Sequence, residues 1–144
     1  SRFFMRQQPK DLTCSILAAH PKTGVDISFS LMAKYEDGKS LVGLFGFDTE
    51  YQNFIHAFGP QTSLSVERAY TPPPDTKISI LVKNQNQSTS VSVEPADSFE
   101  IAITNMLQAI ESRNFNSYYE ALLFDAEMLD RMRKSTLTNN RATA

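Results

Sequence analysis

The amino-acid sequence predicts an α+β fold, in which an open, mostly antiparallel sheet of about six to seven strands carries two C-terminal helices packed on one face. Two observations predict this class. Apolar residues recur with a period of two over much of residues 12–93, and with a period of 3.6 over residues 97–134. Residues 1–135 are therefore expected to form one α+β domain, and residues 136–144 a polar tail.

The clearest strand spans residues 25–35, where apolar and polar side chains alternate. The Asp37-Gly38 pair that follows is typical of a tight turn, and it predicts a hairpin with a return strand over residues 40–47. Weaker alternation predicts further strands at residues 12–18, 52–58, 63–69, 77–83 and 88–94. The last two flank a polar turn and should form a second hairpin.

Two helices are expected to follow, each beginning at a pattern typical of helix N-termini. Asp97 with Glu100 fits a capping box for the first helix, and Ser117 with Glu120 fits one for the second. The first apolar stripe comprises Phe99, Ala102, Ile103, Met106, Leu107 and Ile110. The second comprises Leu122, Leu123, Ala126, Leu129 and Met132. Both stripes need an apolar sheet face to cover them.

The opposite face of the predicted sheet should stay open, because two helices of about four turns cover only one face. Ser28, Ser30 and Met32 lie on that face, and charges occur only at the ends of their strand. Fully solvated faces usually carry charged side chains, whereas small uncharged ones suit a partner. We expect these three residues to lie in a homodimer interface formed through the open sheet face. The alternative is a polar face in contact with solvent.

Composition excludes several classes of partner. The net charge is −2, and the 14 Lys and Arg residues form no run, which gives no electrostatic footprint for nucleic acid or an anionic membrane. No segment has the roughly 18 consecutive apolar residues of a membrane span. Cys14 is the only cysteine, so an intrachain disulfide is impossible, and we interpret it as a small buried hydrophobe. A reducing cytoplasm is the expected location.

The sequence assigns no catalytic and no metal-ligating residue. His20 and His56 both lack a second ligand at the spacing that metal sites use, and ordinary surface or core roles are the better interpretation. Asn53, Arg68 and Tyr70 border predicted strand ends, where a ligand can lie. We therefore consider these three residues candidate substrate-binding groups. Purely structural roles are the alternative.

Four segments also occur in a characteristic order, at residues 1–10, 23–39, 52–66 and 97–135. The second contains Gly24-Val25-Asp26 and, further on, Tyr35-Glu36-Asp37-Gly38. The third opens on Gln52-Asn53-Phe54-Ile55 and closes on Ser63-Leu64-Ser65-Val66. In this order the segments resemble the C-terminal domain of the Gfo/Idh/MocA oxidoreductases, the glucose–fructose oxidoreductase and inositol dehydrogenase family.

In that family a Rossmann half binds NAD(P), and a second half lines the substrate site and builds the oligomer. The resemblance implies that this chain is the substrate-side and oligomerisation domain of an NAD(P)-dependent oxidoreductase acting on a sugar, nucleotide-sugar or polyol-like substrate. It also implies that the chain is inactive alone and holds no cofactor, because NAD or NADP binds the N-terminal Rossmann domain that this sequence lacks. The alternative is a free-standing, non-enzymatic ligand-binding or assembly module of the same fold.

Overall fold

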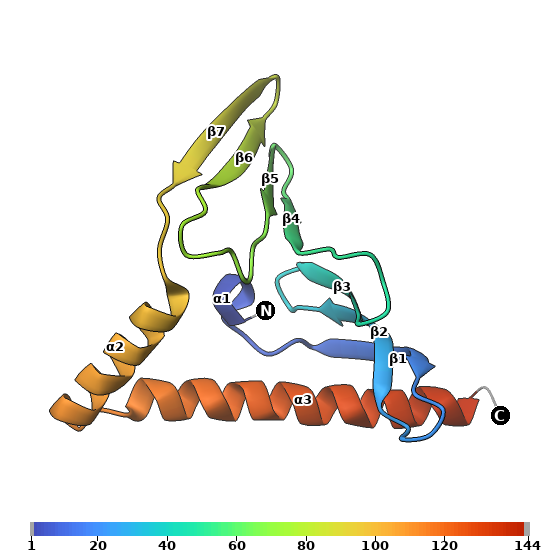
Figure 1. Ribbon diagram of the computed structural model, residues 1–144. Coiled ribbons are helices and arrows are strands. Elements are labelled where there is room, and N and C mark those ends of the chain that lie inside the picture. Colours follow the sequence, from blue (N-terminus) through green and yellow to red (C-terminus); the bar gives the residue numbers. More distant parts are fainter. Residues whose placement is uncertain (1, 143–144) are drawn as a thin grey trace. The chain divides into compact units, whose positions relative to one another are not determined.

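The computed structural model describes residues 2–142. The chain divides into two compact units, one formed by residues 1–49 and 115–144, the other by residues 50–114. The described residues form seven strands and two long C-terminal helices, which confirms the α+β class (Figure 1). The sequence predicts one sheet, whereas the structure has two antiparallel sheets, of three and four strands. Residues 47–53 form a bend without a strand, and this bend separates the strands of the first sheet from those of the second.

The first unit is built on a three-stranded meander. Its elements are α1 (Arg2–Met5), β1 (Asp11–Ala19), β2 (Asp26–Lys34), β3 (Ser40–Gly46) and α3 (Asn116–Ala142). The predicted hairpin of β2 and β3 is confirmed: the N–H of Tyr35 donates to the carbonyl of Lys39 at 2.9 Å. Gly38 has a φ of +80°, a left-handed conformation that glycine adopts at little cost, which explains the Asp-Gly turn.

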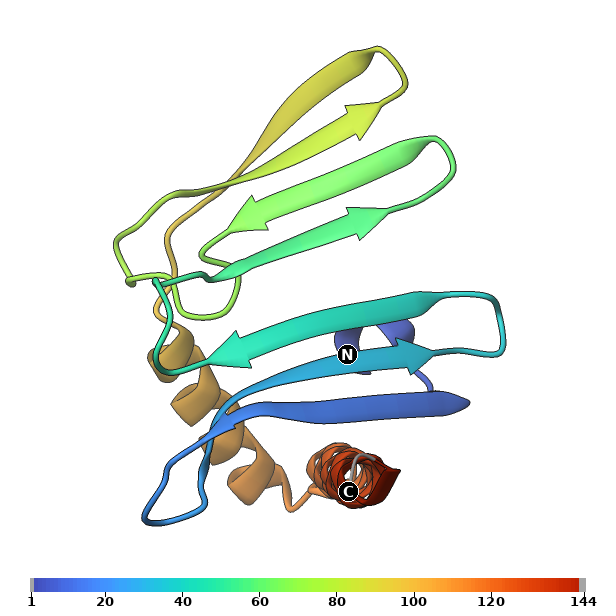
Figure 2. The ribbon, with the colours of Figure 1, turned by 90° about the vertical axis from the view of Figure 1, so that its right-hand side faces the viewer.

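The core of the first unit lies between one face of this meander and α3. The register pairs Cys14 with Leu31 and Leu12 with Ala33, so these side chains share a face. Cys14 is only 2% exposed, and Met128 of α3 is also buried. Figure 2 shows α3 end-on beside β1. The interpretation of Cys14 as a small buried hydrophobe is therefore confirmed.

Several hydrogen bonds fasten α3 to the N-terminal part of the unit, and two of them lie at β1 or next to its start. The backbone N–H of Cys14 donates to Ser135 Oγ at 2.9 Å. Arg131 Nη2 donates to the carbonyl oxygen of Lys10 at 3.2 Å, next to the start of β1. Because β1 is an edge strand of its sheet, these bonds use backbone groups that no neighbouring strand pairs. The helix therefore covers an edge as well as an apolar face.

The helical phase predicted for α3 is wrong. The helix begins at Asn116, so Ser117 lies within the first turn, and its hydroxyl forms no capping bond to any residue that the structure describes. The less exposed positions include Ala121, Phe124, Met128, Met132 and Ser135, of which only Met132 belongs to the predicted stripe. Of the predicted stripe, Leu122 is 68% exposed, and Leu123 and Leu129 are exposed as well. A neighbouring stripe of α3 packs against the sheet instead. The sequence did not distinguish the two stripes, because Leu residues occur on more than one side of this helix.

The second unit contains a four-stranded sheet and one helix. The strands β4 (Phe54–Phe58), β5 (Thr62–Glu67), β6 (Ile78–Asn84) and β7 (Gln87–Val93) pair in sequence order, followed by α2 (Ser98–Ser112). The predicted hairpin of the last two strands is confirmed by the pairing of Asn84 with Gln87. One face carries Ile55, Leu64, Val66, Ile80 and Val82; the other carries His56, Ser63, Ser65, Leu81 and Lys83.

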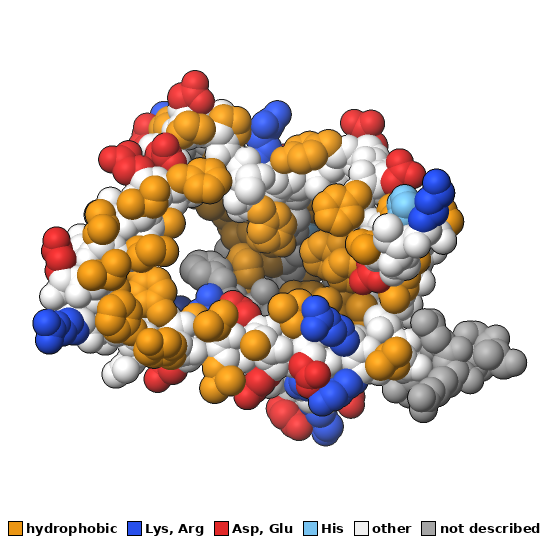
Figure 3. Space-filling view, turned by 60° about the horizontal axis from the view of Figure 1, so that its bottom comes forward, with side chains coloured by type: hydrophobic (Ala, Val, Ile, Leu, Met, Phe, Trp, Pro, Cys, Tyr) orange, Lys and Arg blue, Asp and Glu red, His pale blue; other side chains and the backbone are white. Residues whose placement is uncertain are grey.

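Helix α2 begins as predicted, since Asp97 Oδ1 accepts hydrogen bonds from the N–H groups of Phe99 and Glu100 at 2.9 and 3.2 Å. Its apolar side chains are exposed, and the helix shares no extensive contact with the strands of its unit in the region the structure describes. The expectation of helices packed on a sheet face is met by α3 alone. Figure 3 shows the hydrophobic side chains that gather along α2.

Candidate functional site

A cluster of polar side chains lies where β4 begins and β5 ends, within the second unit. Phe54 pairs with Glu67 in the antiparallel register, so the residues just outside this pair meet each other. The backbone N–H of Ala69 donates to the carbonyl oxygen of Asn53 at 3.4 Å. Of the predicted site residues, Asn53, Arg68 and Tyr70 therefore belong to one loop cluster.

The Asn53 side chain organises this cluster. Its Oδ1 accepts a hydrogen bond from the backbone N–H of Tyr70 at 3.0 Å. Its Nδ2 donates to the hydroxyl of Tyr51 at 2.9 Å and to Thr71 Oγ1 at 3.1 Å. Both amide protons are thus used within the protein, which leaves Asn53 as a group that positions its neighbours. A direct contact of Asn53 with substrate stays a prediction.

Sequence reasoning missed Tyr51, whose phenol is the chemically distinctive group of the cluster. Side-chain hydrogen bonds from Asn53 and then Thr71 lower the pKa of Tyr51 below its ordinary value, and the charge of Arg68 acts in the same direction. The phenol is exposed, so its own proton is available to a bound molecule. Only the spacing of Tyr51 and Asn53, two residues apart ahead of a strand, could have indicated this pairing.

Arg68 supplies the positive charge of the cluster. It has a φ of +52°, a left-handed conformation that costs a residue with a Cβ roughly 1–2 kcal/mol. Backbone strain of this kind is often found at functional sites. Arg68 forms no ion pair within residues 2–142, and the ring of Tyr70 is 65% exposed. A free guanidinium, a phenol and an exposed ring suit an oxygen-rich or phosphorylated ligand.

The second predicted site is the open face of the three-stranded sheet. Ser28, Ser30 and Met32 alternate along β2, so they share the face opposite to buried Leu31. Their register adds Leu44 beside Ser30 and Val42 beside Met32. Val42 is 75% exposed and Leu44 is 72% exposed. The face is therefore more apolar at its centre than β2 alone indicates, because β3 contributes the larger side chains.

The remaining reactive side chains lie apart from these two places. Burial raises the pKa of the Cys14 thiol, and the charge of Asp26 raises it further, which disfavours the nucleophilic thiolate. His20 Nδ1 lies 3.3 Å from the backbone N–H of Thr23, in the turn between β1 and β2. Among the residues described, no three His, Cys, Asp or Glu side chains gather as a metal site would require. In the same part of the chain, no helix is long and apolar enough to cross a membrane.

The fold defines a class: an α+β domain with antiparallel sheets and a long C-terminal helix. No family model matches the sequence. No curated protein matches it either. Solved structures do share the fold, and those found are of KijD10, a 3-ketoreductase from Actinomadura kijaniata.

Three of these structures indicate how far the likeness extends. The chain is similar to KijD10 in complex with NADP and TDP-benzene, with a TM-score of 0.81 at 20% sequence identity over 88% of this chain and 40% of that one. The complex with NADP gives 0.78 at 19% identity, over 87% and 39%. The open conformation, also with TDP-benzene and NADP, gives 0.70 at 18%, over 90% and 39%. The chain thus spans about two fifths of the length of the solved structures it matches.

Proposed function

We propose that this chain is the substrate-side and oligomerisation domain of an NAD(P)-dependent oxidoreductase of the Gfo/Idh/MocA type. Its substrate is a sugar, nucleotide sugar or polyol-like molecule. The observation that carries the proposal is the fold likeness: 88% of this chain matches 41% of a 3-ketoreductase bound to NADP and TDP-benzene, with a TM-score of 0.80. The resemblance of the four sequence segments to the C-terminal domain of that family supports the same proposal.

The loop cluster supplies the groups that such a substrate requires. Sugar hydroxyls exchange hydrogen bonds with phenols and amides, and a diphosphate pairs with a guanidinium. Tyr51, Arg68 and Tyr70 present these groups at one sheet end, and Asn53 holds the loops together. In the intact enzyme we assign substrate contacts to Arg68 and Tyr70 and a positioning role to Asn53. No residue of this chain is assigned a catalytic role.

Hydride transfer requires the nicotinamide, which a Rossmann domain holds in the proposed parent protein. The chain alone is proposed to be inactive, because its sequence has no Gly-rich turn between a strand and a helix that would cradle the pyrophosphate. The exposed apolar side chains of α2 support a parent protein with further protein surface to cover them. The single cysteine fits a reducing cytoplasm.

The oligomerisation role is assigned to the open face of the three-stranded sheet. We propose that Ser28, Ser30 and Met32, with Val42 and Leu44, meet the same face of a second copy. An isologous contact repeats each residue on both subunits, so a compact apolar centre is buried twice. Val42 and Leu44 are exposed in the single chain, which supports the proposal that a partner covers this face.

The proposal is tested on the longer polypeptide that contains this chain, by following NADPH or NADH oxidation with a panel of keto-sugars and nucleotide keto-sugars. We expect turnover by the longer polypeptide and none by residues 1–144. Arg68→Ala should raise KM for a nucleotide sugar by roughly tenfold, which corresponds to one lost charge-assisted hydrogen bond of about 1.4 kcal/mol. A natural polypeptide that starts at Ser1 and never contacts a nicotinamide cofactor would favour the alternative, a free-standing binding or assembly module.

A further inference from the structure

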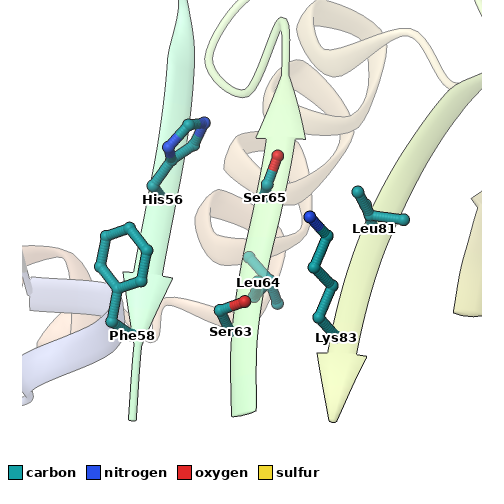
Figure 4. A pocket seen from close by; sticks show the side chains of 7 residues that line it. All are labelled: His56, Phe58, Ser63, Leu64, Ser65, Leu81 and Lys83. Carbon is teal, nitrogen blue, oxygen red and sulfur yellow. The ribbon is translucent and has the colours of Figure 1, made fainter. Parts of the chain in front are cut away.

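A shallow hollow of about 170 Å³ lies on the serine-rich face of the four-stranded sheet. Its walls come from three strands, through His56, Phe58, Ser63, Ser65, Leu81 and Lys83 (Figure 4). The register arranges them in two rungs. Phe58, Ser63 and Lys83 form one rung across β4, β5 and β6, and His56, Ser65 and Leu81 form the next. The hollow is built from regular strands, which hold these side chains more firmly than loops do.

The polar groups of this hollow have no partner in the described part of the protein. Lys83 forms no ion pair, and the hydroxyls of Ser63 and Ser65 take part in no hydrogen bond there. In Figure 4 the Lys83 side chain extends from β6 toward β5, and its ammonium end lies between these two strands. An ammonium and two hydroxyls, each able to donate a hydrogen bond, thus border one space. The acidic residue of β5 on the same face, Glu67, lies one rung beyond the hollow, beside Phe54.

Aromatic rings form the opposite wall. His56 lies 4.9 Å from Phe54 and 6.3 Å from Phe58, measured between ring centroids, so the three rings run in a row along β4. These contacts hold the imidazole beside Ser65, its register partner. The hollow therefore has a cationic, hydroxyl-bearing side and an aromatic side. A ligand that fits both sides carries an anionic group next to a small organic group.

We propose that this hollow binds a phosphate monoester, with the phosphoryl group between Lys83, Ser63 and Ser65 and the organic group against Phe58. A phosphoryl group offers three acceptor oxygens, which matches an ammonium and two hydroxyls better than the two oxygens of a carboxylate. A hollow of about 170 Å³ has room for several water molecules, or for one phosphoryl group and a few attached atoms. The proposal does not rest on the proposed function.

A second copy of the chain is a poorer occupant for this hollow. In a face-to-face contact each copy would bring its own Lys83 toward the partner, and unpaired like charges in a desolvated contact are costly. The hollow carries Ser63, Ser65 and Lys83, whereas the face of the three-stranded sheet carries Val42 and Leu44. The apolar face suits a protein partner, and the hollow suits a small anion.

The experiment is an NMR titration of the 144-residue chain with phenyl phosphate and with inorganic phosphate. Benzoate, which carries a carboxylate in place of the phosphoryl group, is titrated for comparison. Chloride keeps the ionic strength constant. Saturable shifts are expected at the amides of Ser63 and Ser65 and at the ring of His56. We expect a Kd for phenyl phosphate in the range of about 0.1–10 mM, as suits one exposed charge-assisted site. Phosphate should bind more weakly than phenyl phosphate because it lacks the ring, and benzoate should bind more weakly than either.

Lys83→Gln is the test variant, and Lys77→Gln is its matched control. Lys77 precedes the same strand, but its ammonium is paired with Glu94 at 2.8 Å. We expect Lys83→Gln to weaken phenyl phosphate binding at least fivefold, roughly 1 kcal/mol, and Lys77→Gln to change it less than twofold. The double variant Ser63→Ala/Ser65→Ala should weaken binding as well. The amide spectrum reports whether each variant keeps its fold.

Three results would overturn the proposal. One is the absence of saturable shifts up to about 50 mM phenyl phosphate, far above the expected Kd. Another is equal weakening by Lys83→Gln and Lys77→Gln, which would indicate nonspecific charge attraction. The third is a change at His56, Ser63 and Ser65 that follows protein concentration and not ligand, because it would assign the hollow to contact between copies.

Discussion

The backbone N–H of Cys14 donates a hydrogen bond to Ser135 Oγ at 2.9 Å, across 121 residues of sequence. This contact joins the exposed edge of β1 to a helix that the sequence places at the other end of the chain. It satisfies a backbone donor that an edge strand otherwise leaves to solvent. It also locks the helical phase of α3, because Ser135 can reach β1 from one side of the helix only.

Ser135→Ala should therefore lower the free energy of unfolding by on the order of 1 kcal/mol, the usual net value of one intramolecular hydrogen bond. Urea unfolding followed by circular dichroism measures the change. Thr136→Ala is the control, since within the described residues the Thr136 hydroxyl donates to the carbonyl of Arg133 in the same helix and forms no bond to β1. Equal losses from the two substitutions would mean that the link to β1 does not account for the effect of Ser135→Ala, since Ala has a higher helix propensity than either residue and propensity alone would not cause a loss.

Asn53→Ala should loosen the loop cluster and raise the pKa of Tyr51 toward its ordinary value. The reason is that the amide of Asn53 is the largest cause of the lowered pKa, ahead of Thr71 and Arg68. The titration is followed by NMR of tyrosine labelled at Cζ, with Tyr51→Phe to assign the resonance among five tyrosines. Gln52→Ala, one residue away, serves as the control and should leave the titration unchanged. A Tyr51 pKa that is the same with and without Asn53 would contradict this assignment.

Tyr51 also gives the cluster a definite pH dependence. A phenol whose pKa is lowered by folding favours the folded state in its deprotonated form, so its contribution is present at high pH and is lost as the pH falls through the folded pKa. The wild-type chain should thus lose less stability than Tyr51→Phe between neutral and strongly alkaline pH. If the free energies of unfolding of the two proteins change equally with pH across that range, the cluster does not favour the phenolate.

Asp97→Ala should destabilise α2 by on the order of 1 kcal/mol, because the carboxylate caps two N–H groups. Ser117→Ala should change stability by less than about 0.5 kcal/mol, since Ser117 lies inside the first turn of α3 and caps nothing. Both are measured as shifts of the urea midpoint. A larger loss from Ser117→Ala than from Asp97→Ala would restore the capping box that the sequence predicts.

Ser30→Lys should dissociate the proposed homodimer, because it places like charges opposite each other in a desolvated two-fold contact. We expect sedimentation at tens of micromolar, a working range for a weak dimer, to show a dimer for the wild type and a monomer for the variant. Lys39→Gln, in the β2–β3 turn, is the control and should stay dimeric. A wild-type chain that sediments as a monomer throughout this range would show that solvent covers this face.

Much of the local structure could be predicted from the sequence, since it depends on neighbouring residues. The Asp37-Gly38 turn, the strands on either side of it and the Asp97 cap are examples. The phase of α3 could not, because apolar side chains occur around the helix and a distant partner, β1, decides which side is buried. The large side chains of the open face, Val42 and Leu44, were missed because register across two strands was needed to place them beside Ser30 and Met32.

The candidate site, too, could be predicted from the sequence only in part. Asn53, Arg68 and Tyr70 could be selected because polar residues at strand ends are recognisable, and the register of β4 with β5 brings their loops together. Tyr51 was missed because its importance comes from two donors to its oxygen, one of them 20 residues away. The hollow at Lys83 was missed for a related reason: it forms only where the register brings side chains of three strands together.

Because Cys14 is buried beneath α3, the reaction rate of its sulfur reports how often the helix moves away from β1. A thiol that is 2% exposed and has a raised pKa reacts with an alkylating reagent only while the helix is lifted from β1. If the helix closes more slowly than the reagent reacts, the alkylation rate equals the rate at which the helix opens. If it closes faster, the alkylation rate reports the equilibrium constant of opening. The single cysteine thus lets mass spectrometry follow the opening of one element in an unmodified chain.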